Sequence, residues 1–280
     1  MSTFAAPSFS LSMFGINDLR DHNVLNNVMN ALESDQKFEP QYWGFEERKR
    51  QPYDREAVIA EADKSNRQGY GTVYLWRTKT VKYFGYFDAQ DQPFIKLGFN
   101  PKQSKKAIAA AFELANELVA AYQPDIATLS HDIRPDVSGM SPKEVISVLK
   151  FRPASCMAPV DFWELGPAGL AMHTWIGPWY LDQLGRDNVL KTPSVVCDEQ
   201  DWGGIRLSLG QDREPWNHEY MDIIAHRDRA MKHLDPLEIF TVADFDPDRN
   251  YRSSGRKGKK SVLRSRYPLR DPPPPNPHND

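Results

Sequence analysis

The sequence repeats a short pattern at a spacing of 110 residues, and this duplication limits the possible folds more than any other feature. The segment DAQDQPFIKL, from Asp88 to Leu97, has DEQDWGGIRL, from Asp198 to Leu207, as its ungapped counterpart. Each copy follows an apolar stretch and precedes a helix-like one. We therefore predict two related halves, each with the order strand, strand, helix, strand.

Hydrophobic periodicity assigns the elements of these halves. Apolar residues at spacings of three and four predict helices at 21–33, 55–65, 104–122, 141–150, 175–190 and 217–233. Short aromatic and β-branched runs predict strands at 72–76, 81–87, 94–99, 125–129, 194–197, 204–209 and 237–242. Residues 1–20 lack a persistent period and are expected to be irregular or a short edge strand. The fold class expected is α+β, with antiparallel sheets and helices packed on one face.

Charge divides the chain into an acidic body and a basic tail. Residues 246–280 contain nine Lys or Arg and four Asp or Glu, which leaves 26 basic and 34 acidic residues in 1–245. We expect an α+β body at 1–245, with halves at about 20–130 and 170–245 and a linker at 131–169, followed by a poorly ordered, Pro-rich tail. An acidic body repels nucleic acid and attracts basic protein surfaces.

Composition also indicates where the protein acts. No window approaches the roughly 18 consecutive apolar residues that a membrane-spanning helix needs. The N-terminus lacks the basic start of an export signal, and Cys156 and Cys197 allow at most one disulfide bridge. A cytoplasmic protein with two reduced thiols is expected.

The acidic turns of the repeat are the candidate binding residues. Carboxylates facing a basic partner, with tryptophans as apolar anchors, predict a partner-binding set of Asp88, Asp91, Asp198, Glu199, Asp201, Trp202 and Trp216. Two alternatives remain open. The carboxylates could bind calcium, although their spacing matches no calcium-binding loop, or they could lie in solvated hairpin loops with both indoles in the core.

Other reactive residues form no recognisable catalytic motif. His218, His226 and His233 share one predicted helix without a zinc-protease motif, and Cys156 with His173 lacks the sequence signature of a nucleophile and its base. The tail segment 255–261, GRKGKKS, has the wrong glycine spacing for a phosphate-binding loop. We therefore expect no catalytic residue, no metal and no cofactor.

The segment 173–187, HTWIGPWYLDQLGRD, with Pro193, the DWGGIRL run at 201–207 and the helix at 227–234, resembles bacterial immunity proteins of type VI and other polymorphic toxin systems. The similar group is the Trp-rich α+β immunity protein 52 group, and the likeness covers the layout from Thr72 to Val242. It transfers no defined contact residues to this chain.

The resemblance implies a non-enzymatic protein that binds a cognate toxin in the cytoplasm and blocks its active site or the access to it. The charge of the body makes a basic toxin domain, such as a nuclease, the expected partner. Two alternatives remain: a metal-dependent enzyme or one acting on nucleotides or nucleic acids, and a structural protein that forms homo-oligomers.

Overall fold

A computed structural model describes residues 8–15, 17–68, 72–89, 93–100, 104–132, 138–155, 162–163, 165–194, 196–213, 219–244 and 252–254. The helices are α1 (His22–Glu33), α2 (Arg55–Gln68), α3 (Lys105–Tyr122), α4 (Pro142–Ser155), α6 (Pro178–Leu184), α7 (Arg186–Leu190) and α8 (Glu219–Leu234), with a 3-10 turn, η1 (Asp235–Leu237). The predicted tail falls outside the described residues except for 252–254.

The strands confirm the α+β class. They are β1 (Ser8–Phe14), β2 (Tyr42–Glu46), β3 (Lys49–Pro52), β4 (Thr72–Arg77), β5 (Tyr83–Asp88), β6 (Phe94–Phe99), β7 (Ile126–Asp132), β8 (His173–Ile176), β9 (Val196–Glu199), β10 (Ile205–Ser208), β11 (Val242–Asp244) and β12 (Arg252–Ser254). Ten of them form one antiparallel sheet in the order β3-β2-β4-β5-β6-β1-β7-β8-β10-β9, while β11 pairs with β12. β9 and β10 of the second half thus share a sheet with the strands of the first half, whereas the repeat predicts one sheet for each half.

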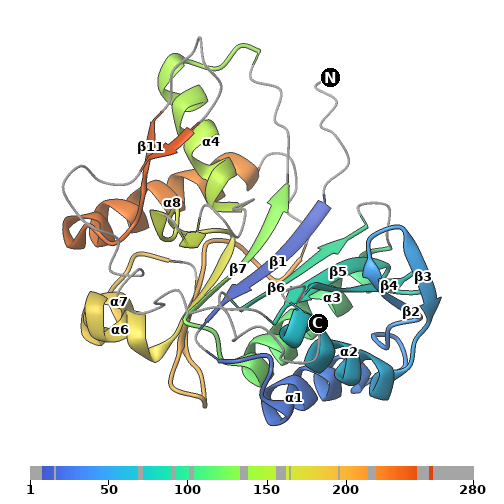
Figure 1. The fold of residues 1–280 in the computed structure, drawn as a ribbon. Helices are drawn as coiled ribbons and strands as arrows, with labels where there is room; N and C mark the ends of the chain where they lie inside the picture. The colour runs from blue at the N-terminus through green and yellow to red at the C-terminus, as the bar shows by residue number, and fades with distance from the viewer. Residues whose placement is uncertain are drawn as a thin grey trace.

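The two halves are arranged symmetrically about β7. Moving outward from β7, the order is β1, β6, β5 on one side, which Figure 1 labels, and β8, β10, β9 on the other. Because every neighbouring pair is antiparallel, β6 and β10 run in the same direction, as do β5 and β9. A half turn about β7 therefore superposes the two arrangements and exchanges the faces of the sheet.

This symmetry places two hydrophobic cores on opposite faces. Neighbouring residues of a strand point to opposite sides, and Met13 lies in the first core while Phe14 lies in the second. On β7, Ala127 and Ile126 divide in the same way. The first core contains residues of α1, α2 and α3, and the second contains residues of α4, α6, α7 and α8. Figure 1 shows these two groups of helices beside the two halves of the sheet.

Corresponding side chains of the two repeated hairpins point toward a core in both copies, but the strands of the two hairpins pair in different registers. Ile95 and Leu97 belong to the first core, and their counterparts Ile205 and Leu207 belong to the second. Ile95 lies opposite Phe87, whereas Ile205 lies opposite Glu199 and not opposite Cys197, which is the counterpart of Phe87. The second hairpin has therefore shifted by two residues, which preserves the facing because side chains alternate with period two.

Three of the sequence-based element assignments are wrong. The strand predicted at 237–242 is instead the end of η1 and a loop, and β11 begins only at Val242. The segment expected to be irregular or an edge strand is β1, which lies inside the sheet between β6 and β7. Trp175, assigned to the start of a helix, lies in β8, and the helix begins only at Pro178. The errors at β1 and β8 arise because these strands are short and lie inside the sheet, so that their few residues give too little periodicity to separate strand from helix. The β2–β3 hairpin was not predicted at all.

Candidate functional site: an aromatic face of the sheet

The strands of the first half bury one face and leave the other partly exposed. On β5 the core-facing Tyr83 and Phe87 are buried, whereas Phe84 and Tyr86 are partly exposed. The same alternation occurs on β6 and on β4 as far as Leu75, whereas Trp76 and Arg77 at the end of β4 are buried. The face turned away from the first core therefore carries apolar side chains that no described helix of that core covers.

Five side chains form a continuous aromatic array on this face: Tyr74, Trp76, Phe84, Tyr86 and Phe94. Cross-strand pairing brings them together, because Tyr74 lies opposite Tyr86 and Trp76 lies opposite Phe84. The ring centroids of Tyr74 and Tyr86 are 5.8 Å apart, and those of Trp76 and Phe84 are 5.6 Å apart. Such separations are typical of favourable aromatic pairs.

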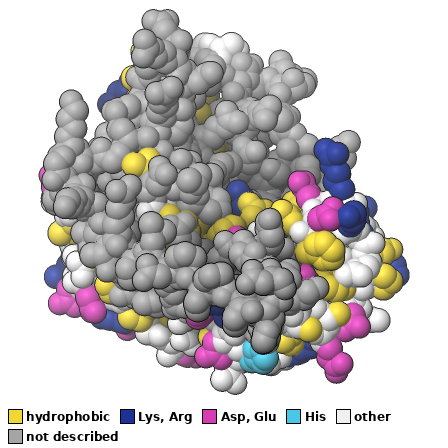
Figure 2. Space-filling model, viewed as in Figure 1, with side chains coloured by type: hydrophobic (Ala, Val, Ile, Leu, Met, Phe, Trp, Pro, Cys, Tyr) yellow, Lys and Arg dark blue, Asp and Glu magenta, His cyan; other side chains and the backbone are white. Residues whose placement is uncertain are grey.

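Charged groups border the array. The guanidinium carbon of Arg50, on β3, lies 4.9 Å from the centroid of the Trp76 ring. The pKa of the Tyr74 hydroxyl is raised by burial first and then by the negative charges of Glu47 and Asp88. In Figure 2, hydrophobic side chains adjoin acidic and basic ones where β3, β4 and β5 lie in Figure 1. The array is thus an apolar surface with a charged rim.

The acidic residues predicted from the repeat do not come together. Asp88 ends β5 and Asp198 lies in β9, six strand spacings away, which corresponds to roughly 29 Å across the sheet. Their side chains also point to opposite faces, because Asp88 lies opposite Phe94 beside the array, while Asp198 shares its face with Arg206 and Trp175. Asp88 and Asp198 therefore belong to two separate acidic regions of the surface.

The remaining predicted binding residues have mixed surroundings. Asp198 and Asp201 are exposed, and Glu199 pairs with Arg186. Trp202 is partly buried against the first core and covers Gly204, where an added Cβ would lie only 2.2 Å from the indole ring. Asp91 and Trp216 lie outside the described residues. Partner binding by this set stays a prediction, and the Trp202 indole already packs within the protein.

A second group of polar residues lies where the sheet meets α3. His173 is fully buried, and its Nδ1 atom lies 2.9 Å from Ser208 Oγ and 3.7 Å from Asp212 Oδ1. Arg206 pairs with Asp212. Burial lowers the pKa of His173 to about 3, with the positive charge of Arg206 as a further cause. The histidine is therefore neutral at physiological pH.

This group lacks the geometry of a catalytic triad. A catalytic histidine contacts the nucleophile through one ring nitrogen and the orienting carboxylate through the other. Here Ser208 and Asp212 both approach Nδ1, and the serine is fully buried. Among the described residues, no three His, Cys, Asp or Glu side chains are placed to hold one metal ion. Cys156, the other residue considered with His173, lies outside the described part of the chain.

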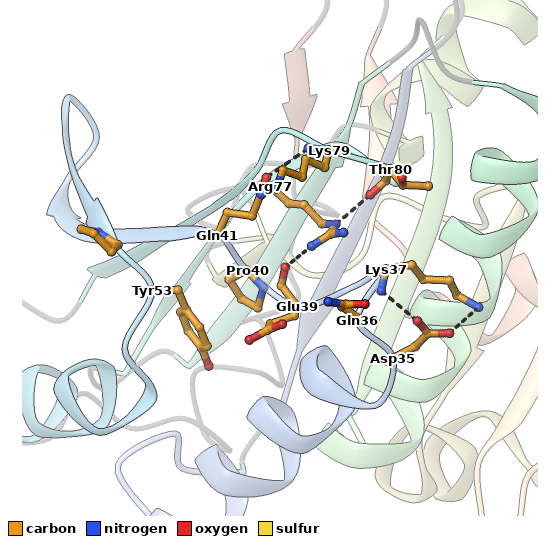
Figure 3. A pocket seen from close by; sticks show the side chains of 11 residues that line it. Asp35, Gln36, Lys37, Glu39, Pro40, Gln41, Tyr53, Arg77, Lys79 and Thr80 are labelled. Carbon is orange, nitrogen blue, oxygen red and sulfur yellow. Dashed lines mark hydrogen bonds and ion pairs between the residues drawn. The ribbon is translucent and has the colours of Figure 1, made fainter.

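A hollow of about 690 Å³ lies at the end of the sheet beside the β4–β5 turn. Figure 3 shows the residues that line it, which come mainly from the 35–41 loop and from the turn at 77–80. Arg77 donates from Nε to the Thr80 carbonyl at 2.7 Å and from Nη1 to the Glu39 carbonyl at 2.5 Å. Lys37 pairs with Asp35 at 3.1 Å. The bond from Arg77 to Glu39 joins the two loops, and the other two interactions lie within one loop each, so these polar groups stabilise the scaffold.

The aromatic array was missed at the level of sequence because both faces of these strands are apolar. The segment TVYLWR at 72–77 alternates Val73 and Leu75 with Tyr74 and Trp76, and the whole run resembles a strand that is buried on both sides. On β4 the useful signal was the segregation of aromatic from aliphatic side chains between the two faces.

Comparisons with known proteins identify no family for this chain. No family model matches it, and no curated protein matches it. The solved structures that are similar include the Pseudomonas aeruginosa T6SS protein PA0821, with a TM-score of 0.48 and 9% sequence identity over 85% of this chain and 86% of that chain. A likeness of this size assigns neither a family nor a function. In the part of the chain that the structure describes, no helix is long and apolar enough to cross a membrane.

Proposed function

We propose that this protein is an immunity protein that binds a cognate bacterial toxin in the cytoplasm and blocks its active site or the access to it. The observation that carries the proposal is the aromatic array, a partly exposed apolar face of a rigid sheet with a charged rim. The resemblance of 173–187 and 201–207 to immunity proteins of type VI and other polymorphic toxin systems supports the same function.

The array suits the requirements of toxin neutralisation. An immunity protein must release its toxin slowly, and slow release depends on a few well-packed anchors from which water is excluded. Aromatic side chains are the commonest anchors because they present a large area with few rotatable bonds. Tyr74, Phe84 and Tyr86 are held in place by a sheet, so little conformational freedom is lost when a partner covers them.

The toxin encoded beside the gene of this protein provides the test. We expect the two proteins to form a complex that inhibits the toxin, and Tyr86→Ala to accelerate dissociation by about 10-fold or more, since truncating a central anchor costs about 2 kcal/mol. Phe45→Ala is the matched control, because Phe45 is 50% exposed but does not belong to the array. Dissociation would be followed by biolayer interferometry.

Further variants separate the two candidate surfaces. Asp198→Lys and Asp201→Lys test the acidic hairpin predicted from the repeat. If only these two accelerate release, the toxin binds at the β9–β10 hairpin and the array is not the contact surface. If the toxin neither binds nor loses activity, the proposed function is wrong.

A further inference from the structure

The aromatic array already accommodates one guanidinium group of the chain itself. Arg50 reaches over Trp76 from the neighbouring edge of the sheet, with 4.9 Å between the guanidinium carbon and the ring centroid. This distance is within the range of attractive cation–π contacts, which extends to about 6 Å. Trp76 is only 4% exposed. The arginine site on Trp76 is therefore occupied, while Tyr74, Phe84 and Tyr86 remain partly exposed beside it.

Charges of both signs border the partly exposed rings, since Lys96 lies opposite Tyr86 on the same face. Asp88 ends the strand that carries Tyr86, and its carboxylate accepts a hydrogen bond from Thr72 Oγ1 at 3.1 Å, on the strand that carries Tyr74. Glu47 lies in the turn between β2 and β3, three residues after Gly44, which pairs with Tyr74. Burial raises the pKa of both tyrosines most, and the negative charge of Glu47 raises it further. Ring faces and carboxylates attract the same kind of ligand, a cation with an apolar or planar surface.

We propose that Tyr74, Phe84 and Tyr86, with the carboxylates of Glu47 and Asp88, receive arginine side chains of a basic polypeptide segment. The proposal rests on the proposed function and names the chemistry of the partner surface. A guanidinium stacks flat on the rings and donates hydrogen bonds to a carboxylate at its edge. The acidic balance of residues 1–245 favours the same partner.

Arginine is favoured over nucleic acid bases as the occupant. Bases also stack on aromatic side chains, but nucleic-acid sites combine such rings with basic grooves that follow the phosphates. Here the carboxylate of Asp88 lies at the end of the strand that carries Tyr86, and Arg50 is already positioned on Trp76. Tyr86 has Lys96 opposite it and Asp88 two residues further along its own strand, so these described neighbours form no continuous basic groove for a phosphate backbone.

The experiment uses the full-length protein and labelled peptides of alternating Gly and Arg, followed by fluorescence anisotropy. Matched peptides with Lys or with citrulline in place of Arg test whether binding needs a cation that is also planar. Lys keeps the charge without the planar group, and citrulline keeps the planar shape without the charge. Oligothymidine tests the nucleic acid alternative. We expect the Arg peptide to bind most tightly, the Lys peptide more weakly and the citrulline peptide at least 10-fold more weakly.

Variants locate the binding. Tyr74→Leu with Tyr86→Leu should weaken binding of the Arg peptide by roughly 5-fold or more, because two ring faces are lost. Tyr74→Phe with Tyr86→Phe keeps the rings and should stay within about 2-fold. Glu47→Gln with Asp88→Asn should also weaken binding. Asp198→Asn with Asp201→Asn removes the same charge at the distant hairpin and should not.

Equal weakening by the two charge pairs, with no effect of the leucine pair, would mean general attraction to an acidic protein and would overturn the inference. Tighter binding of oligothymidine than of the Arg peptide would also overturn it. The outcome is separable from that of the proposed function. A toxin that binds through the array when the Arg peptide does not bind contradicts only the arginine chemistry, and a bound peptide without a bound toxin contradicts only the immunity function.

Discussion

Two buried histidines are the most unusual residues of the structure. His131 is 2% exposed, and neither of its ring nitrogens has a hydrogen-bond partner among the described residues. Its ring packs on Phe9, with centroids 4.4 Å apart. His173 is also buried, with Nε2 unpaired in the same part of the chain. Both are held neutral by burial, which lowers each pKa to about 3.

Buried neutral histidines make the stability depend on pH. Between about pH 6.5 and pH 3, the unfolded chain binds a proton at each of these positions and the native chain does not. The free energy of unfolding should therefore fall as the pH falls below about 6.5, by about 1.4 kcal/mol per pH unit for each histidine.

Replacing one buried histidine tests whether it contributes to the pH dependence of stability. His131→Phe keeps the ring against Phe9 and removes a titrating group, so the loss of stability between pH 7 and pH 5 should shrink by about 2 kcal/mol. Urea unfolding at both pH values measures it. An unaltered slope in His131→Phe would mean that His131 is already protonated or hydrated in the native state.

Individual elements follow their local sequence closely where the helix signals are strong. Ser104 is the N-cap of α3, and its side chain accepts a hydrogen bond from the Ala107 amide at 3.2 Å. Gln123 ends the helix in the left-handed conformation just before Pro124. The short strands behave differently, since β1 and β8 are identified only by their neighbours on both sides.

Each of the two strands that flank β7 is followed by a glycine, Gly15 after β1 and Gly177 after β8. Both glycines pack on the main chain of Pro124 and Asp125, just before β7 begins. A Cβ atom at Gly177 would lie 2.3 Å from the Pro124 carbonyl oxygen and 3.0 Å from Asp125 Cα. A Cβ atom at Gly15 would lie 3.1 Å from the Asp125 nitrogen and 3.1 Å from Pro124 Cα. These close approaches fix where β1 and β8 meet β7, because main-chain atoms cannot move aside as side chains can.

We therefore expect Gly177→Ala to destabilise the protein by about 1–3 kcal/mol, the usual cost of overpacking. The matched control is Gly98→Ala, where the added Cβ would make an ordinary contact of 3.7 Å with the Phe84 carbonyl oxygen. Thermal unfolding of both variants provides the comparison. Equal melting temperatures would show that the β7–β8 junction adjusts without strain.

For the whole molecule, the two cores are joined through the centre of one sheet. β1 and β7 each contribute alternate residues to both cores, as Met13 and Phe14 illustrate. Neither half can expose its core without breaking the strand pairs of the other. The duplication has thus produced a continuous sheet with helices on opposite faces of its two halves.

This coupling predicts a single unfolding transition. Urea denaturation followed by far-ultraviolet circular dichroism and by tryptophan fluorescence should give the same midpoint, because loss of either core removes support from β1 and β7. Phe14→Ala, which truncates a residue of the second core, should lower both midpoints together. Two separated transitions would mean that the halves are independent folding units.

The sequence alone determined the α+β class, the strongest helices and the paired hairpins, because these depend on local periodicity and on capping residues such as Ser104. It also revealed the acidic turns, but only the tertiary structure decided that Asp88 and Asp198 lie far apart on opposite faces. The position of the aromatic array was likewise decided only by the tertiary structure. Tyr74, Tyr86 and their neighbours form an array only through cross-strand register, and only the packing of helices on the other side leaves them partly exposed.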